Sequence, residues 1–432
     1  MNKVPRSQMI AQEIAEFLRS GVGGEADVTG TLVRLGAQRV VQEMLEAEVE
    51  DFLGRAHYER RKADQEFAGY RNGYVERGVK TAEGKIPVYV PQVRDTEEPY
   101  RSRLMESLKG NSEALARLIL EMYARGLSCR DIEDTFKDDA TGECLISKSS
   151  VSRVTESLWD DYEAFRKRSL SGFQVEYLFL DAVYESLREQ AGVSEGILCA
   201  WGILRDGRKA LLHMDLGNKE SYDAWLEFLR DMVKRGLNVP LTVTTDGAPG
   251  LTKAVEAMWP ETLRIRCWAH KTRNVLDKVR EEDKDAVRND LNGIRDAGSY
   301  DKGKARLEQF VQEYGTKYPS AVKALLDDVE ASLAHLQLPP NHHKYVRTTN
   351  LIERSFEEER RRTKVIPRFF DEKSCLKLAF ATLWRASQRW RKVHFGEFEQ
   401  RQIKRLRLTL GVDNPRESQQ MEAEPKAAIV AS

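Results

Sequence analysis

The stretch VEYLFLDAVY, from Val175 to Tyr184, decides how the rest of the chain is interpreted. It consists almost entirely of β-branched, aromatic and leucine side chains, which is typical of a strand buried on both faces of a sheet. After Glu176, Asp181 is the one carboxylate in the run. An ionised carboxylate is costly to bury without compensation, so Asp181 either caps a turn, pairs with an arginine or binds a metal ion.

A second β-rich run, PLTVTTDGA at Pro240–Ala248, also ends in an aspartate, Asp246. The sequence between the two runs predicts two strands and then an amphipathic helix, at residues 196–204, 208–216 and 221–235. A right-handed helical crossover returns the fourth strand parallel to the first and beside it. We therefore predict that Asp181 and Asp246 lie next to each other at strand ends, and that residues 262–266 add a fifth strand.

A third carboxylate is expected from the helix TTNLIERSFEEERRRTKV, which begins at Thr348 or Thr349. Leu351, Ile352 and Phe356 are predicted to face the core, and Glu353 lies at the inner edge of the first turns. Glu353 is therefore preferred over Glu357, Glu358 and Glu359, the last two of which lie among arginines. Three carboxylates form an all-oxygen site, which suits two Mg²⁺ or Mn²⁺ ions that activate a hydroxyl and stabilise a leaving oxygen.

Several basic segments are candidate contacts to DNA phosphates. Residues 55–80 interleave arginines, including Arg71, with aromatic side chains, and Arg71–Gly73 predicts a turn; a solvated surface explains such a charge run equally well. Residues 111–165 predict three helices that match either a helix-turn-helix or a plain bundle. The DNA-contact candidates are Arg71; Lys148, Ser149, Ser152 and Arg153 at the start of the third of these helices; and Arg360, Arg361, Arg362 and Lys364 after Glu353.

The composition is that of a soluble intracellular protein. The 432 residues contain 69 Lys+Arg and 69 Asp+Glu, so net charge neither favours nor excludes nucleic acid. Five scattered cysteines form no disulfide framework, which suits a reducing cytoplasm. No run approaches the ~20 apolar residues of a membrane span, and the N-terminus lacks a signal-peptide core, so no membrane partner is expected.

Several sequence pieces together resemble the bacterial Mutator-like transposases of the insertion-sequence-256 type. They are RNGY at 71–74, LDAVY at 180–184, TTDGAPGL at 244–251, RCWAHKTRNVL at 266–276 and TTNLIER…RRRTK at 348–364. They occur in order over most of the chain. The resemblance implies a ribonuclease-H-like core whose acidic triad falls on Asp181, Asp246 and Glu353, with a helical insertion before the glutamate.

The resemblance also implies a function. Such an enzyme binds the terminal inverted repeats of its element, frees a 3′-OH by metal-dependent cleavage, and transfers it into target DNA. Its partners would be double-stranded DNA and further copies of the chain, and it would act in the cytoplasm on bacterial DNA. A non-catalytic DNA-binding regulator and a structure-selective nuclease on the same fold are the alternatives.

The expected fold class is α/β: a mixed five-stranded ribonuclease-H-like sheet with an all-helical insertion, preceded by a mainly helical DNA-binding region with a helix-turn-helix. Residues 28–54 form a helix whose apolar face packs on its own domain or forms a dimer contact. The predicted organisation is 1–110, N-terminal helical and basic; 111–170, helix-turn-helix; 171–270, first part of the core; 271–345, insertion; 346–412, C-terminal helices of the core; 413–432, disordered tail.

Cys267 and His270 form the family's Cys-x-x-His motif. Two such residues are half of a four-ligand zinc site, and the nearby sequence offers no second pair, so zinc is not expected. We expect the motif to support the strand end or to contact DNA near the carboxylates. His342 and His343, just before the glutamate helix, are expected at the surface.

Overall fold

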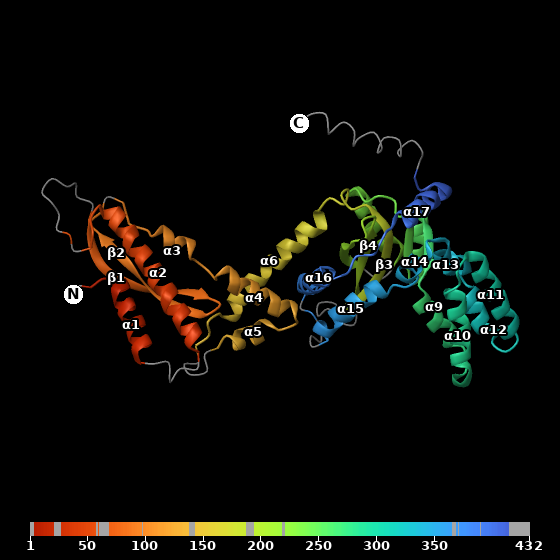
Figure 1. The fold of residues 1–432 in the computed structure, drawn as a ribbon, viewed down its shortest axis with the longest axis horizontal. Helices are drawn as coiled ribbons and strands as arrows, with labels where there is room; N and C mark the ends of the chain where they lie inside the picture. Colours follow the sequence, from red (N-terminus) through yellow and green to blue (C-terminus); the bar gives the residue numbers. More distant parts are fainter. Residues whose placement is uncertain are drawn as a thin grey trace, which may run out of the picture. The chain divides into compact units, whose positions relative to one another are not determined.

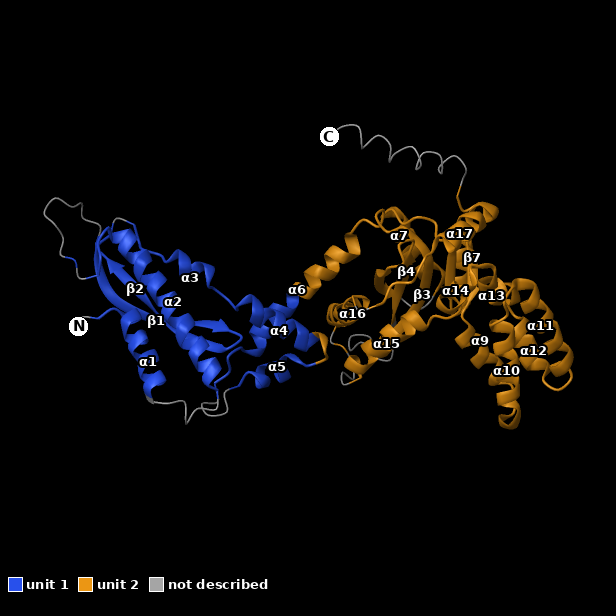
Figure 2. Cartoon of the chain, in the orientation of Figure 1, with its two compact units in different colours: residues 1–123, 127–156 blue, residues 124–126, 157–432 orange. Residues whose placement is uncertain are grey.

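The computed structural model describes residues 4–20, 27–57, 59, 69–96, 98–137, 143–186, 194–217, 221–364, 369, 371–388 and 390–413. These residues form two compact units (Figure 2). Unit 1 comprises residues 1–123 and 127–156, and unit 2 comprises residues 124–126 and 157–432. The predicted disordered tail lies outside the described residues, apart from Asp413.

Unit 1 combines helices with one β-hairpin (Figure 1). Its elements are α1 (Arg6–Ser20), α2 (Val28–Leu53), β1 (Tyr70–Thr81), β2 (Gly84–Arg94), α3 (Arg103–Ser107), α4 (Glu113–Ala124), α5 (Cys129–Thr135) and the first part of α6 (Lys148–Lys167). The helix expected at residues 28–54 is thus confirmed as α2. The expectation of a mainly helical N-terminal region missed β1.

The hairpin packs on α2 because both elements present apolar side chains to a shared core. Leu45 of α2 lies against Val88 of β2, and both are fully buried. The buried Gln42 side chain donates to the Tyr89 carbonyl and accepts from the Tyr89 N–H, each at 2.9 Å, so it satisfies backbone groups of β2. The turn predicted at Arg71–Gly73 was wrong, because these residues form a bulge within β1.

Helices α4, α5 and α6 surround a small apolar core, as the three predicted helices require. Ser128 caps α5 in a reciprocal arrangement: its hydroxyl accepts from the Asp131 N–H, and the Asp131 carboxylate accepts from the Ser128 N–H. Docking of this group on DNA as a helix-turn-helix stays a prediction.

Unit 2 contains the remaining elements (Figure 1). They are β3 (Val175–Ser186), β4 (Ser194–Leu204), β5 (Lys209–Gly217), α7 (Tyr222–Lys234), β6 (Thr242–Thr245), α8 (Pro249–Met258), β7 (Leu263–Arg266), α9 (Trp268–Leu276), the 3₁₀ turn η1 (Glu281–Asp283), α10 (Lys284–Arg295), α11 (Tyr300–Tyr314), α12 (Pro319–Leu326), α13 (Val329–Leu333), the 3₁₀ turn η2 (Ala334–Gln337), α14 (Pro340–Val346), α15 (Asn350–Thr363), α16 (Glu372–Ser387) and α17 (Glu397–Leu410).

The five strands form one mixed sheet in the order β5-β4-β3-β6-β7. Strand β3 pairs antiparallel with β4 and parallel with β6, and β6 pairs parallel with β7. The parallel pairing of β6 with β3 was predicted from the sequence, with α7 as the crossover, whereas the position of β7 beside β6 was not. The ribonuclease-H-like detail of the fold stays a prediction.

Strand β3 is buried on both faces, as its composition predicts. Leu178 and Leu180 belong to the core formed with α7 and α8. Tyr177 and Phe179 alternate with them and are equally buried on the opposite face. On that face the Tyr177 hydroxyl lies 2.6 Å from Nδ1 of His342 in α14. Asp181 has the same parity as Tyr177 and therefore belongs to the face that α14 and α15 approach.

Between β7 and α15 the described chain is helical, in agreement with the predicted insertion. Helices α9 to α13 share their own apolar core, which includes Trp268, Phe310 and Leu325. The expectation that His342 and His343 lie at the surface was wrong. They are 0% and 7% exposed, because α14 packs inward and their Nε2 atoms face the backbone carbonyls of His394 and Leu338.

Helix α17 is held against the start of β3 by buried ion pairs. Arg407, with 4% of its side chain exposed, lies 3.0 Å from the Glu176 carboxylate, which is itself 2% exposed. The same guanidinium lies 2.9 Å from Asp413, and Arg205 adds a second cation to Glu176 at 3.1 Å. Burying the Glu176 charge is tolerable only because these partners compensate it.

Candidate active site

The sheet register places Asp181 and Asp246 at the same level of neighbouring parallel strands. Phe179 of β3 pairs with Thr244 of β6, and each aspartate follows two residues later. Adjacent strands lie about 4.8 Å apart, so the two residues occupy neighbouring positions at this edge of the sheet. Asp246 directly follows the end of β6, as expected. Asp181 does not end its strand, because β3 continues to Ser186 along β4.

Backbone N–H groups orient both aspartates. Oδ1 of Asp181 accepts from the Ala182 N–H, and Oδ1 of Asp246 accepts from the Ala248 N–H, both at 2.9 Å. Between Asp246 and Ala248 the chain turns through Gly247, which has φ +87°. This left-handed φ favours glycine, and a Cβ here would also overlap the guanidinium of Arg266, which lies against Gly247.

Glu353 reaches this edge of the sheet because the start of α15 is tied to the end of β7. The Trp268 N–H donates to the Arg347 carbonyl at 2.9 Å, and the Thr349 N–H and hydroxyl each contact Sγ of Cys267 at 3.3 Å. The Thr349 hydroxyl also lies 2.9 Å from Oε1 of Glu353. The Cys267 backbone in turn donates to Thr245, the residue before Asp246. Thr349 is the N-cap residue of α15, one of the two starts that the sequence predicted, but its side chain makes no capping hydrogen bond and contacts Glu353.

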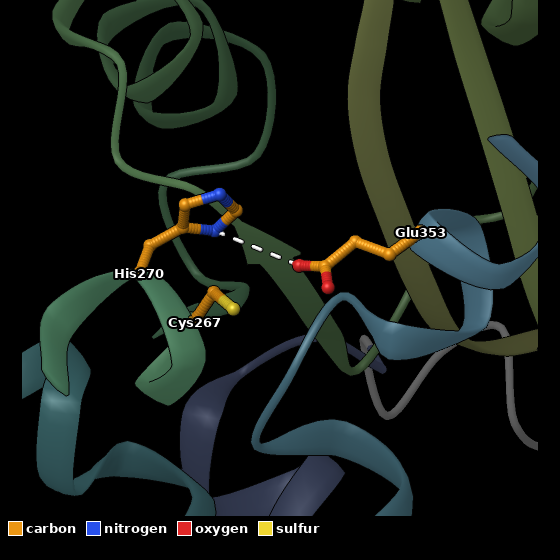
Figure 3. Close-up of side chains that lie close together, drawn as sticks. All are labelled: Cys267, His270 and Glu353. Atoms are coloured by element: carbon orange, nitrogen blue, oxygen red, sulfur yellow. Dashed lines mark ion pairs between the residues drawn. The ribbon is translucent and has the colours of Figure 1, made fainter. Parts of the chain in front are cut away.

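Cys267, His270 and Glu353 lie together at this junction (Figure 3). One ligand atom from each lies within 4.8 Å of the others, and Nδ1 of His270 lies 3.8 Å from Oε1 of Glu353. The neighbouring Cys267 raises the pKa of His270 against the effect of burial, and Asp181 and Glu353 act in the same direction. Among the described residues, the group of mutually close ligand atoms comprises Cys267, His270 and Glu353 and includes neither Asp181 nor Asp246.

The Cys267 thiol has a pKa below its ordinary value. Burial opposes this shift, but hydrogen bonds with His270 and Thr349 outweigh it. A sulfur, an imidazole nitrogen and a carboxylate are softer donors than three carboxylates, and a structural zinc site needs four protein ligands. Among the described residues the cluster offers three. The motif was expected to support the strand end or to contact DNA. Cys267 bonds to Thr245 and Thr349 at the strand end, and the choice between the two roles stays a prediction.

A second carboxylate pair, which the sequence interpretation missed, lies further along the same helix. Glu359 is fully buried, and neither of its oxygens meets a hydrogen-bond donor among the described residues. It faces Glu185 of β3, whose Oε1 accepts from the Thr363 hydroxyl at 3.1 Å. Burial, and then the Glu185 charge, raise the pKa of Glu359 to about 8. The position of Glu359 among arginines in the sequence did not reveal this burial; it shares the inward face of α15 with Ile352 and Phe356.

The predicted DNA-contact residues differ in their surroundings. Lys148, Ser149, Ser152 and Arg153 are exposed on the first turns of α6. Arg71 instead donates to the Arg55 and Ala56 carbonyls and is partly buried. On α15, Arg360, Arg361 and Lys364 are exposed, whereas Arg362 is mostly buried and bonds to Glu358.

Comparison with known proteins gives a consistent picture. The family model described as "Transposase, Mutator family" matches residues 10–393. The transposase for insertion sequence element ISRM5 of Rhizobium meliloti strain 1021 is 35% identical over 81% of this chain and 86% of that protein. The transposase for IS406 of Burkholderia multivorans is 29% identical, over 87% and 94%. The transposase for IS256 in transposon Tn4001 of Staphylococcus aureus is 28% identical, over 81% and 89%.

Among solved structures, the Drosophila P element transposase strand transfer complex matches 73% of this chain and 93% of that chain, with 11% identity and a TM-score of 0.29. A likeness this low supports no conclusion about the site. Within the described residues, no helix has both the length and the apolar character needed to cross a membrane.

Proposed function

Because this chain belongs to the Mutator family of transposases, enzymes that cleave DNA and transfer its strands, we propose that Asp181, Asp246 and Glu353 form its catalytic site. The observation that supports this proposal most directly is the parallel register of β3 and β6, in which each aspartate follows a paired residue by two positions. The contacts of Thr349 with Cys267 and Glu353, which tie the start of α15 to the end of β7, support including Glu353 in the proposed site.

Transposases of this kind generally use divalent metal ions, and the donor set fits them. The three proposed ligands are carboxylates, which Mg²⁺ and Mn²⁺ prefer, and two ions are proposed here. Bound there, such ions would lower the pKa of an attacking water or 3′-OH and stabilise the leaving oxygen. Zinc is not proposed, because Cys267 is engaged by Thr349.

The chain's own residues would hold the reacting groups in place. The Ala182 and Ala248 N–H groups fix one oxygen of each aspartate, and the Thr349 hydroxyl fixes one oxygen of Glu353. The Arg266 guanidinium beside Gly247 has a buried Nη1 with no hydrogen-bond partner among the described residues. It is a cation adjacent to Asp246, where a phosphate would approach.

We further propose that the substrate is the pair of terminal inverted repeats of an insertion sequence, followed by a target duplex. The exposed residues Lys148, Ser149, Ser152 and Arg153 would read the ends, and Arg360, Arg361 and Lys364 would hold the backbone near the carboxylates. Arg71 and Arg362 are engaged within the protein and would contribute less.

The test is cleavage and strand transfer by the full chain on DNA that carries the element's ends, in Mg²⁺ or Mn²⁺. We expect a new 3′-OH at the end of the repeat and joined products when target DNA is added, with little product on a scrambled repeat. Binding to the ends without any cleavage would support the non-catalytic regulator, and cleavage without joining would support a nuclease.

We also propose that the active assembly is a dimer or larger, paired through the outer face of α2. Val33, Val40 and Met44 are 48%, 57% and 52% exposed. With Gly36 and Ala47 they recur at three- and four-residue steps on the side of α2 opposite the buried Leu45 and Val49. Gly36 lies in the same row with open space above it, which lets a second helix approach closely.

The charges of α2 favour a second copy in antiparallel orientation. Its first half carries Arg34 and Arg39, and its second half carries Glu43, Glu46, Glu48, Glu50 and Asp51. Antiparallel pairing centred near residue 42 sets the basic half against the acidic half and brings Val40 to Met44 of the second copy. A parallel pair would place like charges opposite each other. DNA is not the expected partner of this face, because the acidic half of α2 repels a phosphate backbone.

Val40→Arg should therefore shift the full chain from dimer to monomer, with at least a tenfold weaker dimer by light scattering after size exclusion. Val233→Arg, at a 39% exposed valine on α7, is the matched control and should leave the dimer intact. In a Cys144→Ser background, mixed Val33→Cys and Asp51→Cys chains should cross-link, whereas Val33→Cys alone should not. A wild-type chain that stays monomeric at all concentrations contradicts this interface. Cross-linking that occurs only between two Val33→Cys chains contradicts it as well.

A further inference from the structure

A pocket of about 450 Å³ opens between the edge strand β5 and the end of α16, both in unit 2. It lies at the end of the sheet away from the proposed catalytic carboxylates. Leu204, which lines it, pairs with Val175 at the start of β3, whereas Asp181 pairs with Cys199. Six residues of strand correspond to about 20 Å, so the pocket is separate from the catalytic site.

The lining of this pocket is strongly cationic. It includes Arg168, Arg208, Lys209 and Lys392, and no carboxylate is among its described lining residues. Arg208 forms an ion pair with Asp206 at 2.5 Å. The other three cations form no ion pair with a described carboxylate, so their charge is available to an anionic ligand.

The positive charge of Arg168 contacts aromatic rings and a backbone carbonyl, and no described carboxylate pairs with it. Its guanidinium lies 4.4, 4.8 and 5.4 Å from the ring centroids of Phe165, Phe173 and Trp384, and it donates to the Leu211 carbonyl at 2.6 Å. Its Nε is buried with no hydrogen-bond partner among the described residues. Burial, with the nearby Arg235, lowers the pKa of Arg168 to about 10.

Aromatic faces complete the lining. Trp384 of α16 packs edge-on against Phe165 and stacks on Phe380, and 37% of the residue is still exposed. The ring centroids of Trp390 and Trp201 lie 4.2 Å apart. Proteins that bind single strands combine cations for the phosphates with aromatic rings on which unpaired bases stack. A duplex has its bases stacked internally, so only an unpaired base can use these rings.

We propose that this pocket binds an unpaired nucleotide of DNA, with its base against Trp384 and its phosphates between Lys209 and Lys392. The separation of about 20 Å from Asp181 places this nucleotide several positions from the reacting phosphate. The pocket would thereby hold a strand that cleavage or displacement has freed. The role in transposition rests on the proposed function, whereas binding of single-stranded DNA does not.

The test is fluorescence anisotropy of the full chain with labelled oligo-dT of about 20 nucleotides, beside a duplex of equal length. Trp384→Ala should weaken oligo-dT binding about tenfold and change duplex binding less than twofold. Trp384→Phe should stay within about threefold of wild type. Tyr222→Ala, at a 38% exposed tyrosine on α7, is the matched control and should bind as wild type. Lys209→Ala and Lys392→Ala should each reduce the salt slope for oligo-dT by about 0.7.

If Trp384→Ala binds oligo-dT with wild-type affinity, the pocket proposal is wrong. It is also wrong if Tyr222→Ala loses as much affinity for oligo-dT as Trp384→Ala does. Thermal unfolding of each variant separates lost binding from lost folding, and the retained binding of Trp384→Phe adds a second check. Cleavage of element ends by the wild type is measured in parallel. If the ends are cut while Trp384→Ala binds oligo-dT normally, only the pocket proposal fails. If oligo-dT binding depends on Trp384 and no ends are cut, only the proposed function fails.

Discussion

Asp246→Asn should lower cleavage of element ends on the order of a thousandfold or more, while binding of those ends stays within about threefold of wild type. Asparagine keeps the Oδ1 that accepts from the Ala248 N–H, so the turn through Gly247 should survive. What it removes is the negative charge beside Asp181. The measurement is the rate of 3′-OH formation under single-turnover conditions, with DNA binding followed by anisotropy.

Asp181→Asn and Glu353→Gln should behave in the same way, because all three carboxylates would share the same ions. The matched control for Glu353→Gln is Glu357→Gln, since Glu357 lies one turn further along α15 and is exposed. It should cut at the wild-type rate. Wild-type cleavage by any one of the three triad variants would remove that residue from the site.

Glu359→Gln should stabilise the protein at alkaline pH by on the order of 2 kcal/mol and have little effect near pH 4.5. In the folded state the pKa of Glu359 is about 8, raised from 4.5, so the buried carboxyl keeps its proton where the unfolded chain has lost it. Between these two values the unfolded state binds fewer protons, and the free energy of unfolding falls as pH rises. Glutamine has no proton to lose and can donate to Glu185.

The measurement is the urea midpoint of wild type and variant between pH 4.5 and 9. The two curves should separate as pH rises and run parallel above about pH 8. Glu357→Gln again serves as the control, because that side chain is exposed, and its curve should follow the wild type throughout. A Glu359→Gln variant that is less stable than wild type at pH 8.5 would contradict this prediction. It would mean that a hydrogen bond between Glu359 and Glu185 stabilises the fold by more than the raised pKa of Glu359 destabilises it.

The sheet was predictable because its strands differ sharply from their surroundings in composition. The run Val175–Tyr184 and the run ending at Asp246 are separated by a hairpin and one amphipathic helix, and only a right-handed crossover joins them. The expected neighbourhood of Asp181 and Asp246 followed from that topology. The strand end was misplaced because Asp181 breaks the apolar run, whereas pairing with Cys199 and its neighbours carries β3 further.

What the sequence did not reveal are contacts that depend on packing across the fold. Helical periodicity alone could not show that Glu359 turns inward, since a glutamate among arginines is normally solvated. The polar sequence of residues 340–344 hid the burial of His342, which depends on Tyr177 and a distant carbonyl. Similarly, the sequence did not show that the Thr349 side chain contacts Glu353 instead of capping α15, because capping is the usual role of threonine at such a position.

The buried pair between Glu176 and Arg407 has a consequence for synthesis of the protein. The two residues are 231 positions apart, so the ribosome delivers Glu176 long before its buried partner. At about 5–20 residues per second, the interval is roughly ten to fifty seconds. During that time the first strand of the sheet has only the partly exposed Arg205 to offset its charge. Interrupted synthesis should therefore yield chains that chaperones and proteases recognise as unfinished, and an incomplete transposase would be removed before it could cut DNA.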